Sequence, residues 1–127
     1  MLGELEVDDS TILCDMEAGI GTVLRLQPGE VDLVLVVAEP SAKAGDVAAR
    51  AARIAATRAE VVVVANKLRG DDDLELIRAA VGEHELVPVP QDAAIERADR
   101  EGVAPIDLDP ESPAVRAIAT LAQRLTR

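Results

Sequence analysis

Several residues suited to binding a nucleotide and its metal ion directly follow apolar runs of this sequence. Asp15 comes after the run TILC at residues 11–14, and Gly19 lies four residues further on. An aspartate at the end of a strand can orient a water molecule on Mg²⁺, and a glycine lets backbone N–H groups approach a γ-phosphate. The structural alternative is that Asp15 only stabilises the next turn. The spacing leaves both roles open.

Asn66 and Lys67 follow a second apolar run, VVVVA at residues 61–65. The Asn66 carboxamide both donates and accepts hydrogen bonds, which suits it to the edge of a purine base. A turn asparagine with a left-handed backbone is the structural alternative, and the spacing does not decide between the two. A third polar group, Pro90, Gln91 and Asp92, follows the weaker run LVPV at residues 86–89.

The apolar runs before these residues predict the strands of a parallel sheet. DLVLVVA at residues 32–38 and VVVVA at residues 61–65 hardly alternate with polar residues, which is typical of central parallel strands covered on both faces. With the shorter runs at residues 11–14 and 86–89, they make about four strands. Because ligands of such sheets bind beyond the carboxyl ends of the strands, we expect the polar groups at one edge.

Stretches with helical spacing of apolar residues separate the strands. They cover residues 43–58, 71–82 and 91–101. Ser112 and Pro113 are a typical start for a further helix over residues 114–125. This alternation indicates an α/β fold, with helices on both faces of a mainly parallel sheet. No linker or repeat divides the chain, so residues 1–127 are expected to form one domain.

Composition limits the location and the partners. The chain has 13 Lys and Arg against 24 Asp and Glu, a net charge of −11, and no Phe, Tyr or Trp. A net anion without aromatic stacking groups is a poor ligand for nucleic acids or acidic membranes, so neither is expected as a partner. The single cysteine, Cys14, and the lack of a signal segment or an apolar run of about 18 residues predict a cytoplasmic protein.

Longer strings carry a family resemblance. They are ILCDMEAGIGTVLRL, VDLVLVVAEPSAKAGDVAARAARIA, VVVVANKLR and the pattern PQD…AD…G…P that ends at Pro105. From about residue 10 to its end, the chain resembles the nickel-insertion ATPases of the carbon monoxide dehydrogenase system, in the MinD/ParA branch of P-loop ATPases. The resemblance implies a partial P-loop NTPase-like three-layer fold. It also implies an adenine-nucleotide-binding module that uses ATP and Mg²⁺.

The resemblance assigns roles to the polar groups. Asp15 would be the Walker B aspartate, a catalytic residue that acts on the metal ion through water. Glu17 and Gly19 would belong to the switch that senses the γ-phosphate.

The same resemblance implies a base-binding side. Asn66 would contact adenine, and Lys67 would pack its stem near the base. Pro90, Gln91 and Asp92 would close over the far side of the base. Arg69 stands where the guanine motif NKxD has its aspartate, so GTP specificity is not expected.

The sequence also departs from the family. It contains no GxxxxGK[ST] and no GKGG-type variant, the loops whose amides and lysine hold phosphates. We therefore expect no hydrolysis by this chain alone, and ATPase activity would require another polypeptide to contribute the P-loop. The family's Cys-x-Cys pair is missing as well, since Cys14 stands alone, and nickel binding is not expected.

In the family, the P-loop strand lies between the strand that ends at Asp15 and the strand at residues 32–38. Without it, both strands would have unpaired edges, which are costly when buried and prone to association. Three outcomes are open: the two strands pair directly, a second chain supplies a strand, or two copies associate. We expect a homo-oligomer or a partner chain that supplies the P-loop half.

Two other functions compete with the nucleotide-binding module. The chain is alternatively a degenerate, nucleotide-free interaction or regulatory protein that oligomerises through the family surface. A phosphoacceptor receiver domain matches the length and the acidic pair Asp8-Asp9, but its acceptor aspartate would fall at Val36 or Val37. Valine cannot accept a phosphoryl group, so this class is set aside.

Overall fold

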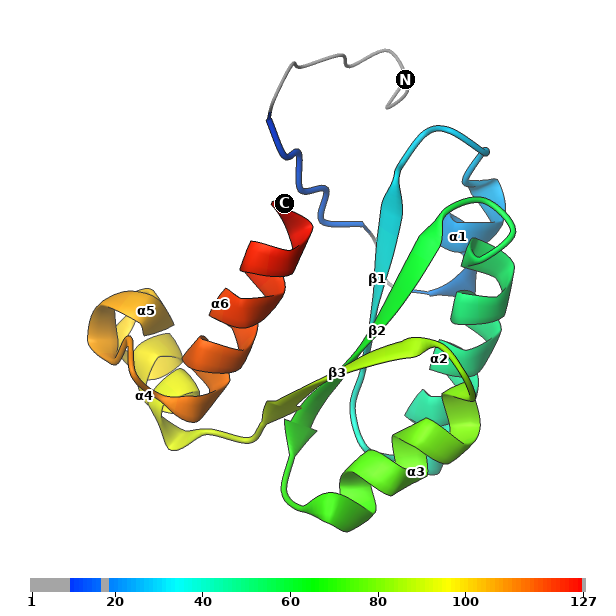
Figure 1. The fold of residues 1–127 in the computed structure, drawn as a ribbon. Coiled ribbons are helices and arrows are strands. Elements are labelled where there is room, and N and C mark those ends of the chain that lie inside the picture. Colours follow the sequence, from blue (N-terminus) through cyan, green and yellow to red (C-terminus); the bar gives the residue numbers. More distant parts are fainter. Residues whose placement is uncertain (1–9, 17–18, 127) are drawn as a thin grey trace.

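The computed structural model describes residues 10–16 and 19–126 (Figure 1). Its elements are α1 (Ile20–Arg25), β1 (Leu33–Ala38), α2 (Ala42–Ala55), β2 (Glu60–Leu68), α3 (Asp71–Val81), β3 (Glu85–Pro90), α4 (Ala93–Glu101), α5 (Pro105–Leu108) and α6 (Pro113–Leu125). No helix in this part of the chain has the length and hydropathy that crossing a membrane requires.

The three strands form one parallel sheet in the order β1-β2-β3. Val36 of β1 lies opposite Val63 of β2, which in turn lies opposite Leu86 of β3. β2 is central, and residues 61–65 are buried on both faces, as its unbroken valine run predicts. The α/β prediction with a parallel sheet is confirmed.

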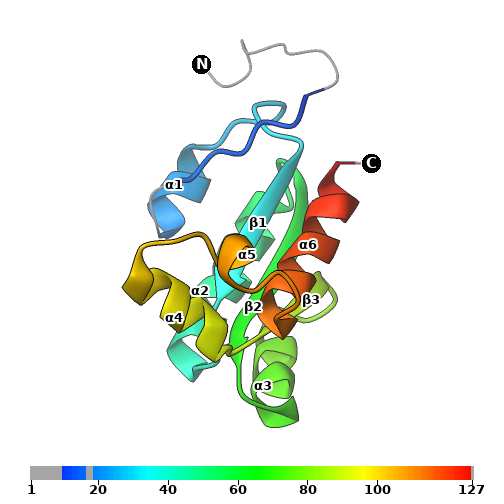
Figure 2. The same ribbon diagram turned by 90° about the vertical axis from the view of Figure 1, so that its left-hand side faces the viewer.

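Helices cover both faces of this sheet (Figures 1 and 2). On one face, α2 and α3 pack against alternate strand residues, with Val63, Ala52 and Ile77 at the centre of the cluster. On the other face, α6 packs mainly on β3, and Leu121 meets Val62 and Val89. Alanines fill most of the helix side of the core, which lets the helices lie close to the valine-rich strands.

An ion-pair network fastens the end of α6 to the amino edge of the sheet. Arg124 Nε donates to Glu85 Oε1 at 2.9 Å, and Arg124 Nη2 reaches Glu85 Oε2 and Glu60 Oε1, both at 2.6 Å. The hydrogen bonds from Arg124 hold the pKa of Glu85 below its ordinary value. This edge is opposite to the carboxyl ends of the strands.

The predicted strand at residues 11–14 does not form. Residues 10–16 contain no helix or strand, and their side chains are exposed; Leu13 is 80% accessible. The described sheet therefore has three strands rather than four, and direct pairing of this segment with β1 is wrong. A four-residue run makes few backbone hydrogen bonds and buries little surface, so its strand-like composition alone does not bring it into the sheet.

Candidate functional site

The polar residues that follow the three strands meet at the carboxyl edge of the sheet. They line a pocket of about 410 Å³, whose wall consists of Glu39, Pro40, Ser41, Lys67, Arg69 and Gln91. Each strand contributes to this wall, because the ends of parallel strands lie side by side. Of the predicted nucleotide residues, Lys67 and Gln91 line the pocket directly.

An irregularity at the end of β2 shapes this pocket. Ala65 pairs with Pro88 and Leu68 with Pro90, so β2 holds one residue more than β3 over the same stretch. Within this bulge Asn66 is half-buried, and Lys67 has a left-handed φ of 58°. That conformation costs a non-glycine residue roughly 1 kcal/mol, and such backbone strain is concentrated at functional sites.

The bulge corrects two expectations about residues 66 and 67. The strand does not end at Ala65 but continues to Leu68. The left-handed residue is Lys67, not Asn66, so the alternative of a left-handed turn asparagine is wrong. An extra residue in one strand re-aims the side chains that follow it, which is how Lys67 comes to line the pocket.

An ion pair joins the ends of β1 and β2 across the pocket. Lys67 Nζ lies 2.8 Å from Glu39 Oε1, and both side chains are more than half exposed. The hydrogen bond to Glu39 raises the pKa of Lys67. Arg69 is a second cation in the pocket wall, and its backbone N–H donates to Asp73 Oδ2 at 2.8 Å. The wall itself thus carries two cations and one anion, although the whole chain is strongly acidic.

The loop after β3 is held in place from two sides. The backbone N–H of Gln91 donates to the carbonyl of Leu68 at 2.8 Å, and its side-chain amide donates to Glu96. Pro90 is the last residue of β3 and is half-buried. These two hydrogen bonds hold the loop against the end of β2 and the first turn of α4.

Asp92 holds two helices together. Its Oδ1 accepts the N–H of Ala94 in α4, and its Oδ2 accepts the N–H of Ala114 in α6, each at 2.9 Å. These two backbone donors, with the Ser112 side chain, hold the pKa of Asp92 below its ordinary value. The carboxylate is therefore engaged with the protein, and Asp92 does not line the pocket.

The other predicted residues lie before β1. Asp15 is exposed in the segment of residues 10–16. Gly19 has a φ of 114°, a backbone conformation that favours glycine, and it directly precedes α1. Glu17 lies outside the described residues.

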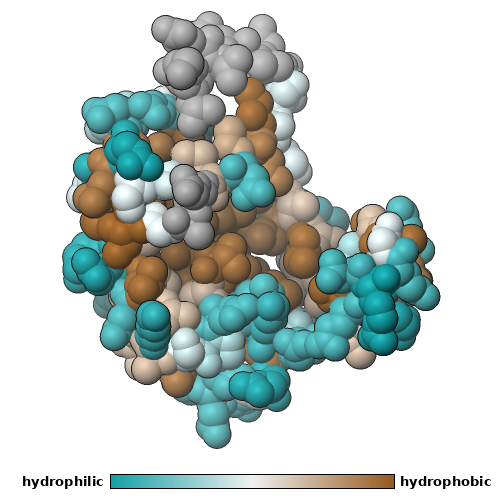
Figure 3. Space-filling model, turned by 180° about the vertical axis from the view of Figure 1, so that it is seen from behind, coloured by the Kyte–Doolittle hydropathy of each residue, from teal (hydrophilic) through white to brown (hydrophobic). Residues whose placement is uncertain are grey.

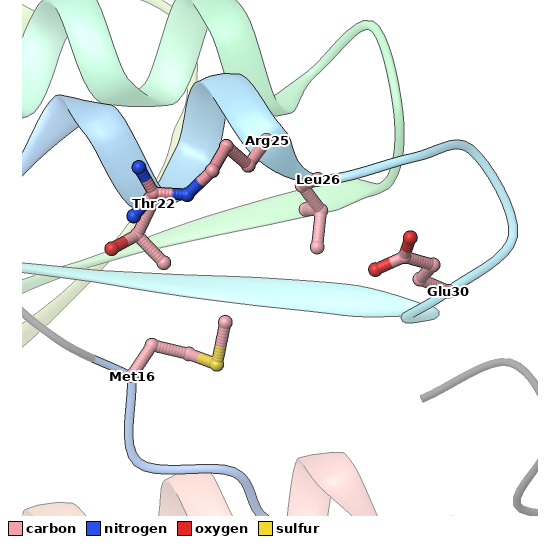
Figure 4. Close-up of a pocket in the computed structure, with 5 residues that line it drawn as sticks. All are labelled: Met16, Thr22, Arg25, Leu26 and Glu30. Atoms are coloured by element: carbon pink, nitrogen blue, oxygen red, sulfur yellow. The ribbon is translucent and has the colours of Figure 1, made fainter. Parts of the chain in front are cut away.

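A second pocket, of about 270 Å³, lies beside the segment that contains Asp15 (Figure 4). Met16 contributes from that segment, Thr22 and Arg25 from α1, and Leu26 and Glu30 from the connection to β1. Within residues 10–16 and 19–126, no group of three or more His, Cys, Asp or Glu is placed to hold a metal ion. A single carboxylate is nevertheless compatible with Mg²⁺, which keeps several waters and takes its other ligands from phosphates.

Glu39, which follows an apolar run directly as the other polar residues do, also belongs to this site. Its position directly after β1 was a usable signal, because every residue that follows a parallel strand is near the carboxyl edge. Its partnership with Lys67 was not foreseeable, since it depends on the bulge in β2.

The fold and the site define an open parallel α/β protein with a polar pocket at the carboxyl edge of its sheet. No protein-family model matches the chain. The chain is 33% identical over 102 residues to the carbon monoxide dehydrogenase accessory protein CooC of Rhodospirillum rubrum. The match covers 78% of this chain and 39% of CooC, so the chain spans about two fifths of the length of that relative. This similarity supports a relation to the MinD/ParA-type nickel-insertion ATPases.

Proposed function

We propose that this chain is an adenine-nucleotide-binding module of the MinD/nickel-insertion ATPase type. The observation that carries the proposal is the pocket at the carboxyl edge, where Glu39, Lys67 and Gln91 from the ends of three parallel strands meet. This is the place where open α/β sheets bind their ligands. The 33% sequence identity to CooC supports a nucleotide as the ligand of this pocket.

Residues in and beside the pocket have distinct tasks in this proposal. The Asn66 amide is the group that reads the adenine edge, since it can donate and accept at once. The Lys67 stem packs against the base while Glu39 holds its ammonium group at 2.8 Å. The loop of Pro90 and Gln91 covers the opposite side of the base, and the hydrogen bond from the Gln91 N–H to the Leu68 carbonyl holds it there.

The phosphate side is incomplete in this proposal. Asp15 is the residue that would act on Mg²⁺ through water, and the ion would neutralise phosphate charge. No glycine-rich phosphate loop occurs in the 127 residues. We therefore infer that the chain alone binds ATP weakly, with a dissociation constant of about 0.1–1 mM, and does not hydrolyse it. Turnover would require a polypeptide that brings the phosphate loop.

A titration with a fluorescent ATP analogue and Mg²⁺ tests the proposal. Saturable binding is expected, and Asn66→Ala should weaken it about tenfold, the effect of one lost hydrogen bond to the ligand. Gln123→Ala, at an exposed position on α6, is the control and should leave binding unchanged. The chain has no Trp or Tyr, so the protein adds little background to the signal. Equal affinity of the Asn66→Ala variant and the unmodified chain would contradict the base-binding role.

One observation favours the alternative function of a nucleotide-free interaction protein. The outer edge of β1 has no partner among the described residues, and such edges are sites of association. If the titration shows no binding at millimolar concentrations of the ATP analogue, the nucleotide-free interaction protein becomes the favoured function.

A further inference from the structure

The helices α2 and α3 lie side by side on one face of the sheet, and their outer sides are exposed to solvent (Figure 1). Gly45 of α2 lets them approach closely, because a Cβ at this position would lie only 3.1 Å from the Cβ of Ala80 in α3. Leu76 of α3 lies next to the same glycine and is 39% exposed. The two helices therefore present one continuous surface, which we call the α2–α3 face.

The α2 half of this face is cationic. Lys43, Arg50 and Arg53 recur at helical spacing on the exposed side of α2, and Asp46 is the one carboxylate of the helix. In the described part of the chain, none of these three cations forms an ion pair. A chain with a net charge of −11 thus exposes a local excess of positive charge on α2.

The α3 half of the face is acidic. Asp71, Asp72 and Glu75 are exposed on α3, and Arg78 is the one cation of the helix. The helix dipole explains aspartates in the first turn, but its effect does not extend to Glu75. Glu75 forms no ion pair within the described residues. Its carboxylate is therefore available to a cation from outside the chain.

A cationic area beside an acidic area makes the α2–α3 face complementary to itself. A twofold axis that lies in the face, between the two helices, would place the α2 cations of each copy against the α3 acids of the other. Such self-complementary contacts are the basis of twofold homodimers. Physiological salt screens exposed charges beyond about 8 Å, so the pairs in contact outweigh the repulsion between two copies of net charge −11. A nucleic acid or an acidic membrane would meet the α3 acids as well, so it fits this face less well.

We propose that this chain forms a twofold dimer through the α2–α3 face. Helices of 14 and 11 residues, each about 10 Å across, offer roughly 400 Å² per copy, about half of a standard interface. The dimer is therefore weak, with a dissociation constant of about 10–100 µM. Apolar side chains gather instead on the other side of the sheet, around the hollow between its body and the part formed by α4 and α5 (Figure 3). Charge, rather than apolar area, thus selects a second copy as the partner.

Sedimentation velocity over a range of protein concentrations, in about 0.15 M salt, tests the proposal. We expect a dimer that forms as the concentration rises through about 10–100 µM. Arg50→Glu and Glu75→Arg should each weaken it at least about tenfold, because each substitution creates two like-charge contacts in the dimer. Glu75→Arg lowers the net charge, so general repulsion between copies predicts the opposite result. Both positions are exposed, and thermal melts check that the variants fold.

A mixture of the two variants is the decisive arm of this experiment. An equimolar mixture of Arg50→Glu and Glu75→Arg should dimerise like the unmodified chain, because each reversed charge then meets the other. Arg100→Glu, at an exposed position on α4, changes the net charge as much as Arg50→Glu does and should leave the dimer unchanged. A monomer up to about 500 µM, a mixture that stays monomeric, or equal effects of Arg50→Glu and Arg100→Glu would overturn the proposal. None of these readouts involves a nucleotide, so they do not depend on the proposed function.

Discussion

Replacing Ile77 with alanine is expected to lower the free energy of unfolding by about 3 kcal/mol. Ile77 of α3 is fully buried in the cluster that joins α2, α3 and one face of the sheet. The chain has no aromatic residue, so aliphatic side chains fill its whole core. Around Ile77 the neighbours include small residues such as Ala52, which cannot extend into the cavity that alanine would leave.

Urea unfolding measures this change, and the next residue of the same helix provides the control. Leu76 is 39% exposed, so Leu76→Ala removes a side chain of equal size that lies partly in water. Its cost is expected to stay near 1 kcal/mol or below. Equal urea midpoints for Ile77→Ala and Leu76→Ala would contradict the packing described for α3, provided that the free energy of unfolding depends on urea concentration equally steeply in both variants.

Asp92→Ala is expected to have the second largest effect, a fall in the melting temperature of about 5 °C at pH 7. The substitution removes the side-chain acceptor at the start of α4 and the side-chain hydrogen bond from this loop to Ala114 at the start of α6. Both helix ends then lose a partner for a backbone N–H group. Asp99→Ala changes an exposed carboxylate in α4 and serves as the control, with a melting temperature close to that of the unmodified chain.

The pH dependence of this effect has a definite sign. Backbone donors hold the pKa of Asp92 in the folded chain below its ordinary value, so the unfolded chain takes up the proton first as the pH falls. The stabilisation is complete above the ordinary pKa near 4 and is lost as the pH falls through the lower pKa of the folded state. The two melting temperatures should therefore converge below about pH 4. A difference that persists undiminished in acid would mean that the carboxylate is not the group responsible.

The strands that the sequence predicts correctly pair with one another in the structure. The valine runs of β1 and β2 are apolar on both faces and pair with each other, so composition and structure agree. Residues 11–14 have a similar composition but pair with no strand in the described part of the chain, and composition alone could not show this. The short helices α1 and α5 were not anticipated, since six and four residues are too few to display a helical period.

The place of the candidate site was predictable, whereas its details were not. The rule that parallel strands gather their carboxyl ends at one edge is sufficient to bring Lys67 and Gln91 together. The left-handed Lys67 and its pairing with Glu39 depend on the register between β2 and β3, which no local pattern reveals. Asp92 is a recognisable helix cap, but its second contact, with Ala114, joins residues 22 positions apart.

The most direct test of the central claim is a map of backbone amide resonances during a titration with ATP and Mg²⁺. We expect progressive shifts at Asn66, Lys67 and Gln91, around the carboxyl ends of the strands. Glu60 and Glu85, at the amino ends of β2 and β3, should stay unchanged and serve as internal controls. Shifts confined to the amino edge, or no shifts up to about 5 mM ATP, would contradict an adenine-nucleotide site at the carboxyl edge.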